Sequence, residues 1–431
     1  MHKINFIPQF LIVIGLFVLF YNPPIFSFNS MHIVGGISIC LLLAFYPKRF
    51  KKWMNYQGLA QKFTYLVLGI ILIFVYGISV SVIGKGNMAD SFAYAIYYLI
   101  DIIPFGALMI IYCSQKNFQS KDYYNLFLLT GYIQAILAVL AFFVEPIKIW
   151  LNERMAAYGY LSIDLIVAHR NYGFAGTLTF ATPILQSILS LMAIYQGITQ
   201  SKRYFLGAAL LAFSAIINAR TSLIVLFIGF FLLFLLSGLS LNKKMKIVIY
   251  GSLLFLIVAL SFAFLNQYAP DTIAWIQEGI EEIFDAISGD VEEGTFAFLL
   301  NPDWYKLPSG FSVLWGTGHR VITGYNGYNS DIGYINDIWF GGIIYAAIKY
   351  FFIYSLIFYL MKHKSEGLIK YMGILFAVLM PILNIKGLAF DMNGFSNMIF
   401  ILFLICISLS KYVEVHRRNI FESLTAEVNY G

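Results

Sequence analysis

The chain has 431 residues, of which 60% are hydrophobic and 12% are charged. A water-soluble domain carries roughly 25% charged residues because its surface must be hydrated, so this composition excludes a soluble globule and indicates a surface that mostly faces lipid. The formal net charge of +6 does not indicate a nucleic-acid partner, because no basic run contains interleaved aromatic residues.

The N-terminal segment from Met1 to Tyr21 has a short basic start followed by an apolar run. It lacks a cleavage site of small residues, and Pro23-Pro24 follows directly, so we expect a retained first span and not a removed signal peptide. The three cysteines fall in apolar segments without paired spacing. This pattern predicts neither disulfides nor a cysteine metal site.

Apolar runs long enough to cross roughly 30 Å of hydrocarbon recur along the whole chain. We therefore predict an all-α polytopic membrane protein with about twelve transmembrane helices. Nine of them fall within 1–265 and three within 333–431, on either side of a large outer loop at 266–332. The runs lie at about 6–21, 31–46, 64–84, 92–113, 123–144, 175–196, 203–219, 221–238, 245–265, 333–360, 367–388 and 395–411.

Basic residues give an independent test of this topology. With the N-terminus in the cytoplasm, every predicted cytoplasmic loop is basic, and together these loops hold most of the 28 lysines and arginines. The positive-inside bias requires this distribution. We therefore expect both termini in the cytoplasm and two long loops on the outer face, at about 145–174 and 266–332.

The larger outer loop contains a predicted amphipathic helix that begins at Pro270-Asp271. Apolar residues recur at helical spacing from Ile273 to Ile287, and acidic residues lie between them. A packed surface helix with a solvated acidic face explains this pattern. A lid, or a docking surface for a partner, explains it as well.

Half of the arginines belong to outer segments, although lysine outnumbers arginine overall: Arg154, Arg170, Arg220 and Arg320. A guanidinium binds phosphate oxygens in a bidentate manner, whereas an ammonium is a point charge, so a diphosphate-bearing ligand would explain the choice. Pairing with nearby carboxylates is the alternative. Arg220 has almost no loop around it and is predicted at the membrane interface, where an arginine meets an anion or extends to lipid headgroups.

Each long outer loop contains a His-Arg pair, His169-Arg170 in the first and His319-Arg320 in the second. A histidine beside a phosphate-binding arginine would suit a base that deprotonates a hydroxyl next to an anionic leaving group. An interfacial hydrogen-bonding role is the alternative, since a third pair, His416-Arg417, occurs in the predicted cytoplasmic tail.

The glycine-rich stretch 316–337 closes the larger outer loop. Its glycines permit left-handed or closely packed backbone, and Tyr325 and Tyr328 provide faces for stacking against sugars. Asp331 stands where a helix is expected to begin, so it is either a helix cap or a catalytic carboxylate. Asp101 and Lys349 lie inside predicted spans, where charges are functional candidates or pair with another span.

Three short motifs together resemble the O-antigen polymerase and ligase superfamily, which are membrane glycosyltransferases of the GT-C type. Segment 218–222, Asn-Ala-Arg-Thr-Ser, resembles the superfamily's entry into a span, and segment 314–318 resembles its Gly-x-Gly turn late in the large loop. Segment 330–335, with 341–344 in the following helix, resembles the loop-to-helix signature of the polymerases. Ligases typically carry His-Asn where this chain has Ser-Asp, which favours a Wzy-type repeat-unit polymerase.

The resemblance implies glycosyl transfer on the outer face of a bacterial inner membrane. Undecaprenyl-diphosphate-linked glycans would be donor and acceptor, a chain-length-regulating copolymerase is a further expected partner, and no nucleic acid is expected. Arginines would stabilise the leaving diphosphate where soluble enzymes often use a metal, so we expect no metal or other cofactor. The hypothesis assigns diphosphate binding to Arg170, Arg220 and Arg320, base catalysis to Asp331 or His319, and glycan binding to Tyr325 and Tyr328.

Other functions stay open at this point. A ligase would transfer finished polymer onto a lipid A core sugar, and a flippase or other transporter would move lipid-linked oligosaccharide. Transporters place charges along a central path, whereas the polar residues of this chain gather at the predicted outer mouth, which favours an enzyme. A structural scaffold would tolerate substitution of every outer arginine.

Overall fold

The computed structural model describes residues 6–25, 29–55, 59–116, 118–157, 172–176, 181–236, 239–266, 270–288, 299, 301–322, 324–363 and 367–409. The described part is mostly helical and contains no strand, apart from an isolated bridge between Tyr325 and Tyr328. The elements in chain order are α1 (Phe6–Tyr21), α2 (Ser30–Ala44), α3 (Pro47–Met54), α4 (Leu59–Ile83), α5 (Met88–Ile96), the π-helix η1 (Tyr97–Ile102), α6 (Ile103–Gln115), α7 (Ser120–Phe143), α8 (Glu145–Ala157), α10 (Ala181–Thr199), α11 (Arg203–Ile216), α12 (Thr221–Leu236), α13 (Leu241–Leu265), α14 (Pro270–Ser288), the 3-10 helix η2 (Pro302–Tyr305), α16 (Ser312–Trp315), α17 (Gly333–Met361), α18 (Gly367–Lys386) and a last helix, Gly394–Leu409.

The bundle is built for a lipid environment. Six of its helical stretches are long and apolar enough to cross a membrane, and five shorter apolar helices accompany them. Large apolar side chains face outward, with Ile83 82% and Leu206 81% exposed, which water would penalise by about 25 cal/mol per Å². The predicted all-α membrane protein is confirmed, and the number of about twelve spans stays a prediction.

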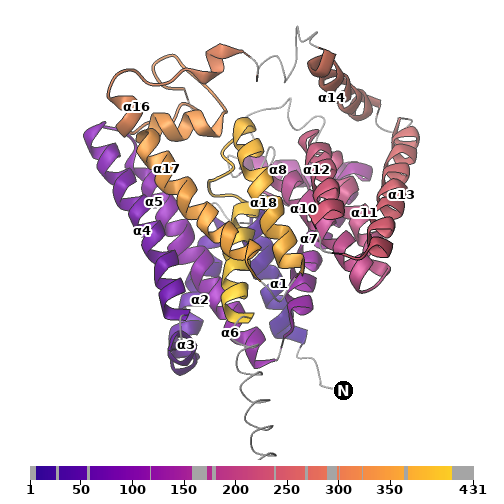
Figure 1. Ribbon diagram of the computed structural model, residues 1–431, viewed down its shortest axis with the longest axis horizontal. Helices are drawn as coiled ribbons and strands as arrows, with labels where there is room; N and C mark the ends of the chain where they lie inside the picture. Colours follow the sequence, from indigo (N-terminus) through magenta and orange to yellow (C-terminus); the bar gives the residue numbers. More distant parts are fainter. Residues whose placement is uncertain are drawn as a thin grey trace, which may run out of the picture.

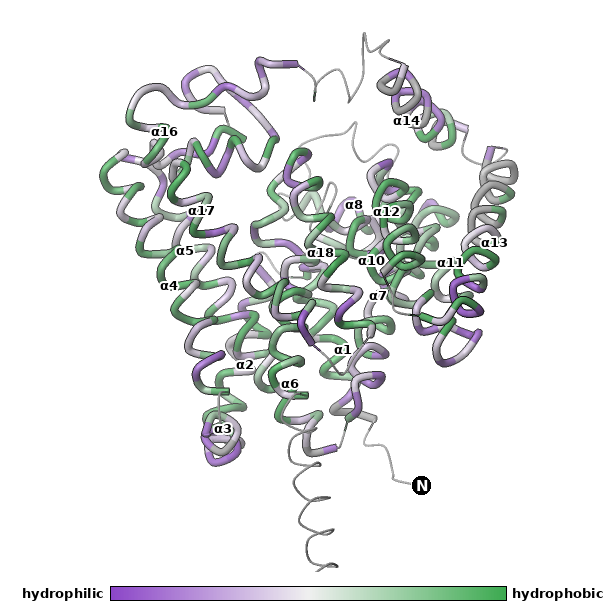
Figure 2. The backbone as a smooth tube through the Cα atoms, in the orientation of Figure 1, coloured by the Kyte–Doolittle hydropathy of each residue, from purple (hydrophilic) through white to green (hydrophobic). Residues whose placement is uncertain are grey.

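Hydrophilic stretches are most frequent at the two ends of the bundle, and the backbone between them is mostly apolar (Figure 2). One end, which we call the loop end, carries α14 and α16 (Figure 1). The opposite end carries the short basic helix α3, whose sequence is Pro-Lys-Arg-Phe-Lys-Lys-Trp-Met. By the positive-inside bias, the sequence prediction assigns this α3 end to the cytoplasm.

Close packing in the bundle depends on small residues, because lipid tails give apolar helices no hydrophobic reason to associate. The most enclosed helix is α10, which packs against α7, α11, α12 and α18 and is buried along nearly its whole length. A Cβ atom added at Gly229 of α12 would lie 2.0 Å from Leu191 Cδ1 on α10. That glycine therefore sets how closely the two helices approach.

Backbone packs directly against backbone where the loop before α17 meets the bundle. Thr317 N–H and Gly318 N–H donate to the carbonyls of Trp339 and Phe340, at 2.7 and 2.9 Å. Those carbonyls are available because α17 is kinked at Gly342, where φ is +73°. The segment that resembles the Gly-x-Gly turn is thereby fixed against the first turns of α17.

Predicted amphipathic character is confirmed for the helix in the larger loop. It spans Pro270–Ser288 as α14, close to the start expected from Pro270-Asp271. Ile273 and Ile276 of its apolar face are buried. This helix is therefore packed on one side, as a surface helix with a solvated acidic face requires.

We predict that Gly342→Ala destabilises the loop end. A Cβ at this position would lie 2.1 Å from the Leu314 carbonyl oxygen. The backbone at Gly342, with φ +73° and ψ −178°, is also a conformation that costs a residue other than glycine about 1–3 kcal/mol. Thermal unfolding of the detergent-purified protein measures the loss. Gly36→Ala on α2 is the matched control, because a Cβ there would meet nothing within 4 Å; equal melting temperatures for both variants would contradict the prediction.

Candidate active site

Five charged side chains meet at the loop end, and we call them the charge network: Asp90, Arg320, Asp337, Lys349 and Asp391. Arg320 Nη1 donates a short hydrogen bond to Asp391 Oδ2, and its Nε lies 3.7 Å from Asp90 Oδ2. Lys349 Nζ lies 2.8 Å from Asp337 Oδ1 and 3.8 Å from Asp391 Oδ2. Asp391 thus joins both cations and links the segment after α18 to α17, and Arg320 extends the network to Asp90 on α5.

Burial makes this network energetically demanding. Each buried ion loses several kcal/mol of hydration, which only close partners and hydrogen bonds return. Tyr350 donates a 2.8 Å hydrogen bond to Asp337 Oδ2, and Asn384 Nδ2 donates to the Tyr350 hydroxyl at 3.1 Å. Burial alone would raise the pKa of Asp391, but the two neighbouring cations outweigh it and hold that pKa well below its usual value. The carboxylate is therefore ionised at neutral pH.

The predicted phosphate-binding Arg320 is the arginine of this network. Its side chain is 11% exposed, and its guanidinium already serves two carboxylates. Among the described residues, its Nε donates no hydrogen bond. A phosphate at this position would therefore compete with carboxylates that already neutralise the guanidinium in part.

Next to it, His319 points the other way, toward the aromatic surface of the loop. Its ring stacks on Tyr325 with centroids 4.2 Å apart and planes 14° from parallel. The turn 325–328 has two central residues with φ of +52° and +73°, as tight hairpin turns require, and both Tyr325 and Tyr328 contact the Trp339 ring. The two predicted glycan-binding tyrosines therefore share one aromatic cluster with His319.

Asp331 does not cap α17, so the cap interpretation is wrong. Ile332 holds the N-cap position, and no side chain caps the helix. The asparagine at 336 organises the approach instead: its Oδ1 accepts from the backbone N–H groups at 321–322, at 3.1 and 2.8 Å, and its Nδ2 donates to the Ser330 carbonyl. Asp331 is left exposed; partial desolvation raises its pKa above the usual value, against the attraction of Lys386.

Arg220 lies in a separate contact with α14. Its Nη2 and Nη1 bond to Glu278 Oε2 at 2.6 Å and Glu282 Oε1 at 2.8 Å, and its guanidinium carbon lies 4.8 Å from the centre of the Trp275 ring. A Cβ added at Gly279 would lie 2.0 Å from Arg220 Cδ. One face of α14 is thus shaped around this arginine. Both carboxylates that pair with it in the described part of the chain come from α14.

The structure brings only part of the predicted site together. Arg320, His319 and the two tyrosines share the loop end above α17, whereas among the described residues no hydrogen bond, ion pair or ring contact joins Arg220 to Arg320 or His319. The predicted pair His169-Arg170 lies outside the described residues. In the described part of the chain, no group of three or more His, Cys, Asp and Glu side chains is placed to hold a metal ion.

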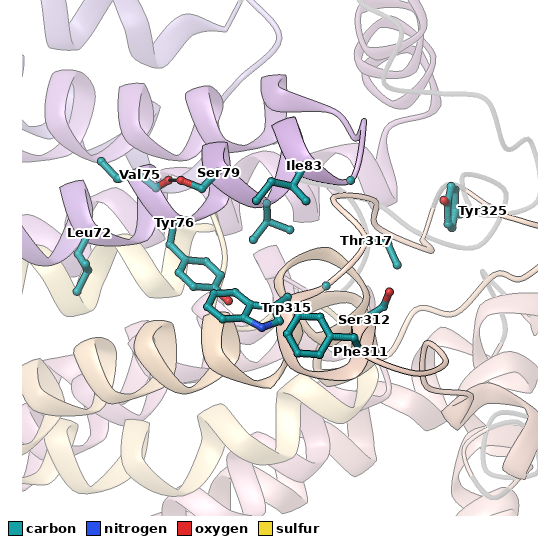
Figure 3. A pocket seen from close by; sticks show the side chains of 13 residues that line it. Leu72, Val75, Tyr76, Ser79, Ile83, Phe311, Ser312, Trp315, Thr317 and Tyr325 are labelled. Atoms are coloured by element: carbon teal, nitrogen blue, oxygen red, sulfur yellow. Dashed lines mark hydrogen bonds between the residues drawn. The ribbon is translucent and has the colours of Figure 1, made fainter.

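An apolar cavity of about 840 Å³, which we call the α4 groove, opens between α4 and the loop that leads to α17 (Figure 3). Tyr76 of α4 and Trp315 lie stacked along it, with centroids 6.0 Å apart and planes 8° from parallel. Tyr325 lines the far end, so the His319 stack adjoins the groove. The groove is therefore apolar along its length and becomes aromatic and polar at one end.

Sequence reasoning missed the acidic members of the charge network. Asp391 lies in the short polar segment Asp-Met-Asn-Gly-Phe-Ser-Asn between two apolar runs, and Asp337 opens a predicted span. A carboxylate in such a position needs a cation, and Lys349 was already recognised as an intramembrane charge. The sequence feature that could have identified these carboxylates is therefore the occurrence of positive and negative side chains in or beside neighbouring spans.

We predict that Asp391→Ala strongly destabilises the protein. The substitution leaves Arg320 without its closest partner, and breaking a buried ion pair from one side costs about 3–5 kcal/mol. Thermal unfolding in detergent measures this loss. Asp303→Ala is the control: Asp303 pairs with Lys306 at 2.9 Å on the exposed surface, where such pairs contribute about 0–1 kcal/mol. Comparable losses in both variants would refute the assigned role of Asp391.

Comparison with known proteins adds no relative to this picture. No family model, no curated protein and no solved structure matches the chain. The evidence for function is therefore the geometry of the loop end together with the three short motifs at 218–222, 314–318 and 330–335.

Proposed function

We propose that the protein is a membrane glycosyltransferase that polymerises undecaprenyl-diphosphate-linked repeat units into O-antigen or a related surface polysaccharide. The α4 groove carries the proposal. It is a mostly apolar cavity that ends at Tyr325, on which the His319 ring stacks, and Arg320 follows His319 in the chain. A lipid-linked glycan likewise changes along its length from an apolar polyprenyl tail to a charged headgroup and polar sugars.

Two of the resembling motifs are connected to this groove, which supports the same function. Gly316 and Thr317 of the Gly-x-Gly-like turn line it, and Ile332 and Ile335 of the loop-to-helix segment belong to a cluster against which the groove-lining Tyr325 packs. In this proposal the loop end faces the periplasm of a bacterial inner membrane. That is where lipid-linked repeat units stand after they have been flipped.

The proposed reaction is one displacement at the anomeric carbon of the donor sugar. The acceptor hydroxyl oxygen forms the new glycosidic bond, the bond to the lipid diphosphate breaks, and its electron pair leaves on a phosphate oxygen. Cationic groups stabilise the departing charge. Arg320 is the candidate nearest to the groove, while Arg220 is open to an anion only if the diphosphate competes with the carboxylates of α14.

A base must take the acceptor proton as the bond forms. The sequence hypothesis names His319 and Asp331, and both remain at the loop end. His319 stacks on the groove-lining Tyr325, whereas Asp331 is exposed beside the start of α17. Contact with the groove therefore favours His319 of these two.

We predict that cells without this protein accumulate undecaprenyl-linked single repeat units and carry surface glycan of one repeat unit. Electrophoresis of the surface glycan, with analysis of extracted lipids, measures both. Loss of all attached glycan would indicate a ligase instead. Absence of repeat units from the periplasmic face would indicate a flippase or other transporter.

We also predict that Ser79→Trp abolishes polymer formation in complemented cells, because the new indole fills the α4 groove between Tyr76 and Ile83. Leu68→Trp is the matched control, since Leu68 lies on the same helix, is exposed, and does not line the groove. Both variants must reach the membrane at the level of the unmodified protein. A full polymer ladder from Ser79→Trp would rule the groove out as the substrate site.

A further inference from the structure

A second cavity, of about 770 Å³, opens between α2 and α5 at the loop end, and we call it the α2 groove. Its lining includes His32 on α2, Phe92 on α5, Tyr97 at the start of η1, and Met392. Met392 follows Asp391 of the charge network directly in the chain. The reaction proposed above involves the α4 groove and no residue of the α2 groove.

A histidine and a carboxylate form a pair in the α2 groove. His32 Nδ1 lies 2.9 Å from Asp101 Oδ2, and among the described residues Asp101 is the one hydrogen-bond partner of the imidazole. The side chain of His32 is 45% exposed, whereas that of Asp101 is 0% exposed. An ionised Asp101 accepts the Nδ1 proton, so the neutral imidazole presents an unprotonated Nε2 toward the cavity.

Two local features of the backbone bring His32 and Asp101 together. Asp101 lies in η1, a π-helical stretch inside an otherwise α-helical span, and such stretches occur frequently at functional sites. On α2, Gly35 allows close approach: a Cβ there would lie 2.4 Å from the Ile100 carbonyl and 2.8 Å from Asp101 Oδ1. His32, one turn earlier on α2, reaches the carboxylate for that reason.

One carboxylate oxygen of the His32–Asp101 pair lacks a hydrogen-bond partner in the described part of the chain. Among the described residues, Asp101 Oδ1 is buried without a hydrogen-bond partner. Leaving such an oxygen unpaired costs about 1–3 kcal/mol or more for a charged group. The buried Asp101 thus lowers the stability of the fold, and it lies directly behind His32, whose side chain is exposed to the α2 groove.

We propose that the α2 groove holds the acceptor end of a lipid-linked glycan and that His32, oriented by Asp101, takes the proton from its attacking hydroxyl. This inference rests on the proposed function and assigns the base to His32 in place of His319. The acceptor O–H bond breaks toward Nε2 while its oxygen bonds to the donor's anomeric carbon. The diphosphate leaves with the electron pair, and the imidazolium later returns its proton to water.

Charge explains why the hydroxyl end of an acceptor fits here better than a diphosphate. The buried Asp101 places a fixed negative charge behind His32, which repels a phosphate and stabilises the imidazolium that proton transfer creates. Among the described residues that line the groove, none is a lysine or an arginine. The donor's diphosphate belongs instead near Arg320, on the other side of Asp391.

The test measures polymer formation by the purified full-length protein in lipid nanodiscs. The probe is the undecaprenyl-linked material extracted from cells that lack the protein, which supplies both donor and acceptor. The variants are His32→Ala, Asp101→Asn and the double variant, with His363→Ala at the α3 end of α17 as the control. Asp101→Asn keeps the shape of the side chain and removes only its charge. The melting temperature of each variant is measured beside its rate, so that a loss of activity is not confused with a loss of folding.

We expect His32→Ala and Asp101→Asn each to lower the initial rate by about 10²–10⁴-fold, as loss of a general base does. Because the two act as a unit, the double variant should be no slower than the slower single variant. Added imidazole should restore part of the rate of His32→Ala, which a merely structural role would not allow. His363→Ala should match the unmodified protein.

Two outcomes separate failure of this inference from failure of the proposed function. If the unmodified protein forms no polymer from the extracted lipid, the proposed function fails and the inference fails with it. If it forms polymer and His32→Ala is equally fast, or if the losses of the single variants multiply in the double variant, only the role of His32 and Asp101 is overturned.

Discussion

The architecture of the loop end depends on the buried contact between Arg320 and Asp391. Arg320 comes from the loop before α17, and Asp391 comes from the segment after α18, so this ion pair closes the loop onto the bundle. Lys349 reaches the same carboxylate from within α17. Among the described carboxylates, removing Asp391 leaves Arg320 with only the longer contact to Asp90, in an interior where an incompletely paired charge is costly. The closure of the loop onto the bundle therefore depends most on this carboxylate.

Electrostatic closure alone would not position the aromatic residues above the α4 groove. Backbone packing does so, because the carbonyls freed at the Gly342 kink accept hydrogen bonds from Thr317 and Gly318. Asn336 then ties the backbone after Arg320 to the start of α17. As a result, Arg320 points into the bundle while its neighbour His319 points into the aromatic cluster. The two neighbouring residues His319 and Arg320, which the sequence suggested would form one site, therefore lie in two different environments.

The amino-acid sequence predicts the helices well and their partners poorly, for a physical reason. Apolar length and periodicity fix where a helix lies and which face it buries, so the membrane bundle and the buried Ile273 and Ile276 of α14 were predictable. Pairing depends on the packing of distant segments: Arg220 meets Glu282, and His32 meets Asp101, across 62 and 69 residues. Periodicity contains no information on which faces will meet.

The local surprises have a related origin. Asp331 does not cap α17, because the hydrogen bonds of Asn336 set the path into the helix. Asn336 donates to the Ser330 and Ile332 carbonyls and accepts from the backbone N–H groups at 321–322, and these bonds outweigh the local preference of an aspartate. The π-helix η1 is equally invisible in the sequence, since its wider turn is stabilised by what packs against it. Gly35 is one such determinant. Strain and unpaired polar groups of this kind concentrate where a protein does chemistry, which directs attention to Asp101.

The two grooves bear on the choice between a polymerase and a transporter. α4 packs on α5 through Phe74 and Phe92, whose centroids are 5.2 Å apart; the α4 groove lies on the α4 side of this pair and the α2 groove on the α5 side. A transporter needs one continuous path for one substrate. A repeat-unit polymerase must hold two lipid-linked substrates whose tails remain in the bilayer while their sugars meet. The two cavities are separate, and the α2 groove includes Ala89 and Met392, the chain neighbours of Asp90 and Asp391 in the charge network. Two separate cavities fit the proposed polymerase better than a single transport path.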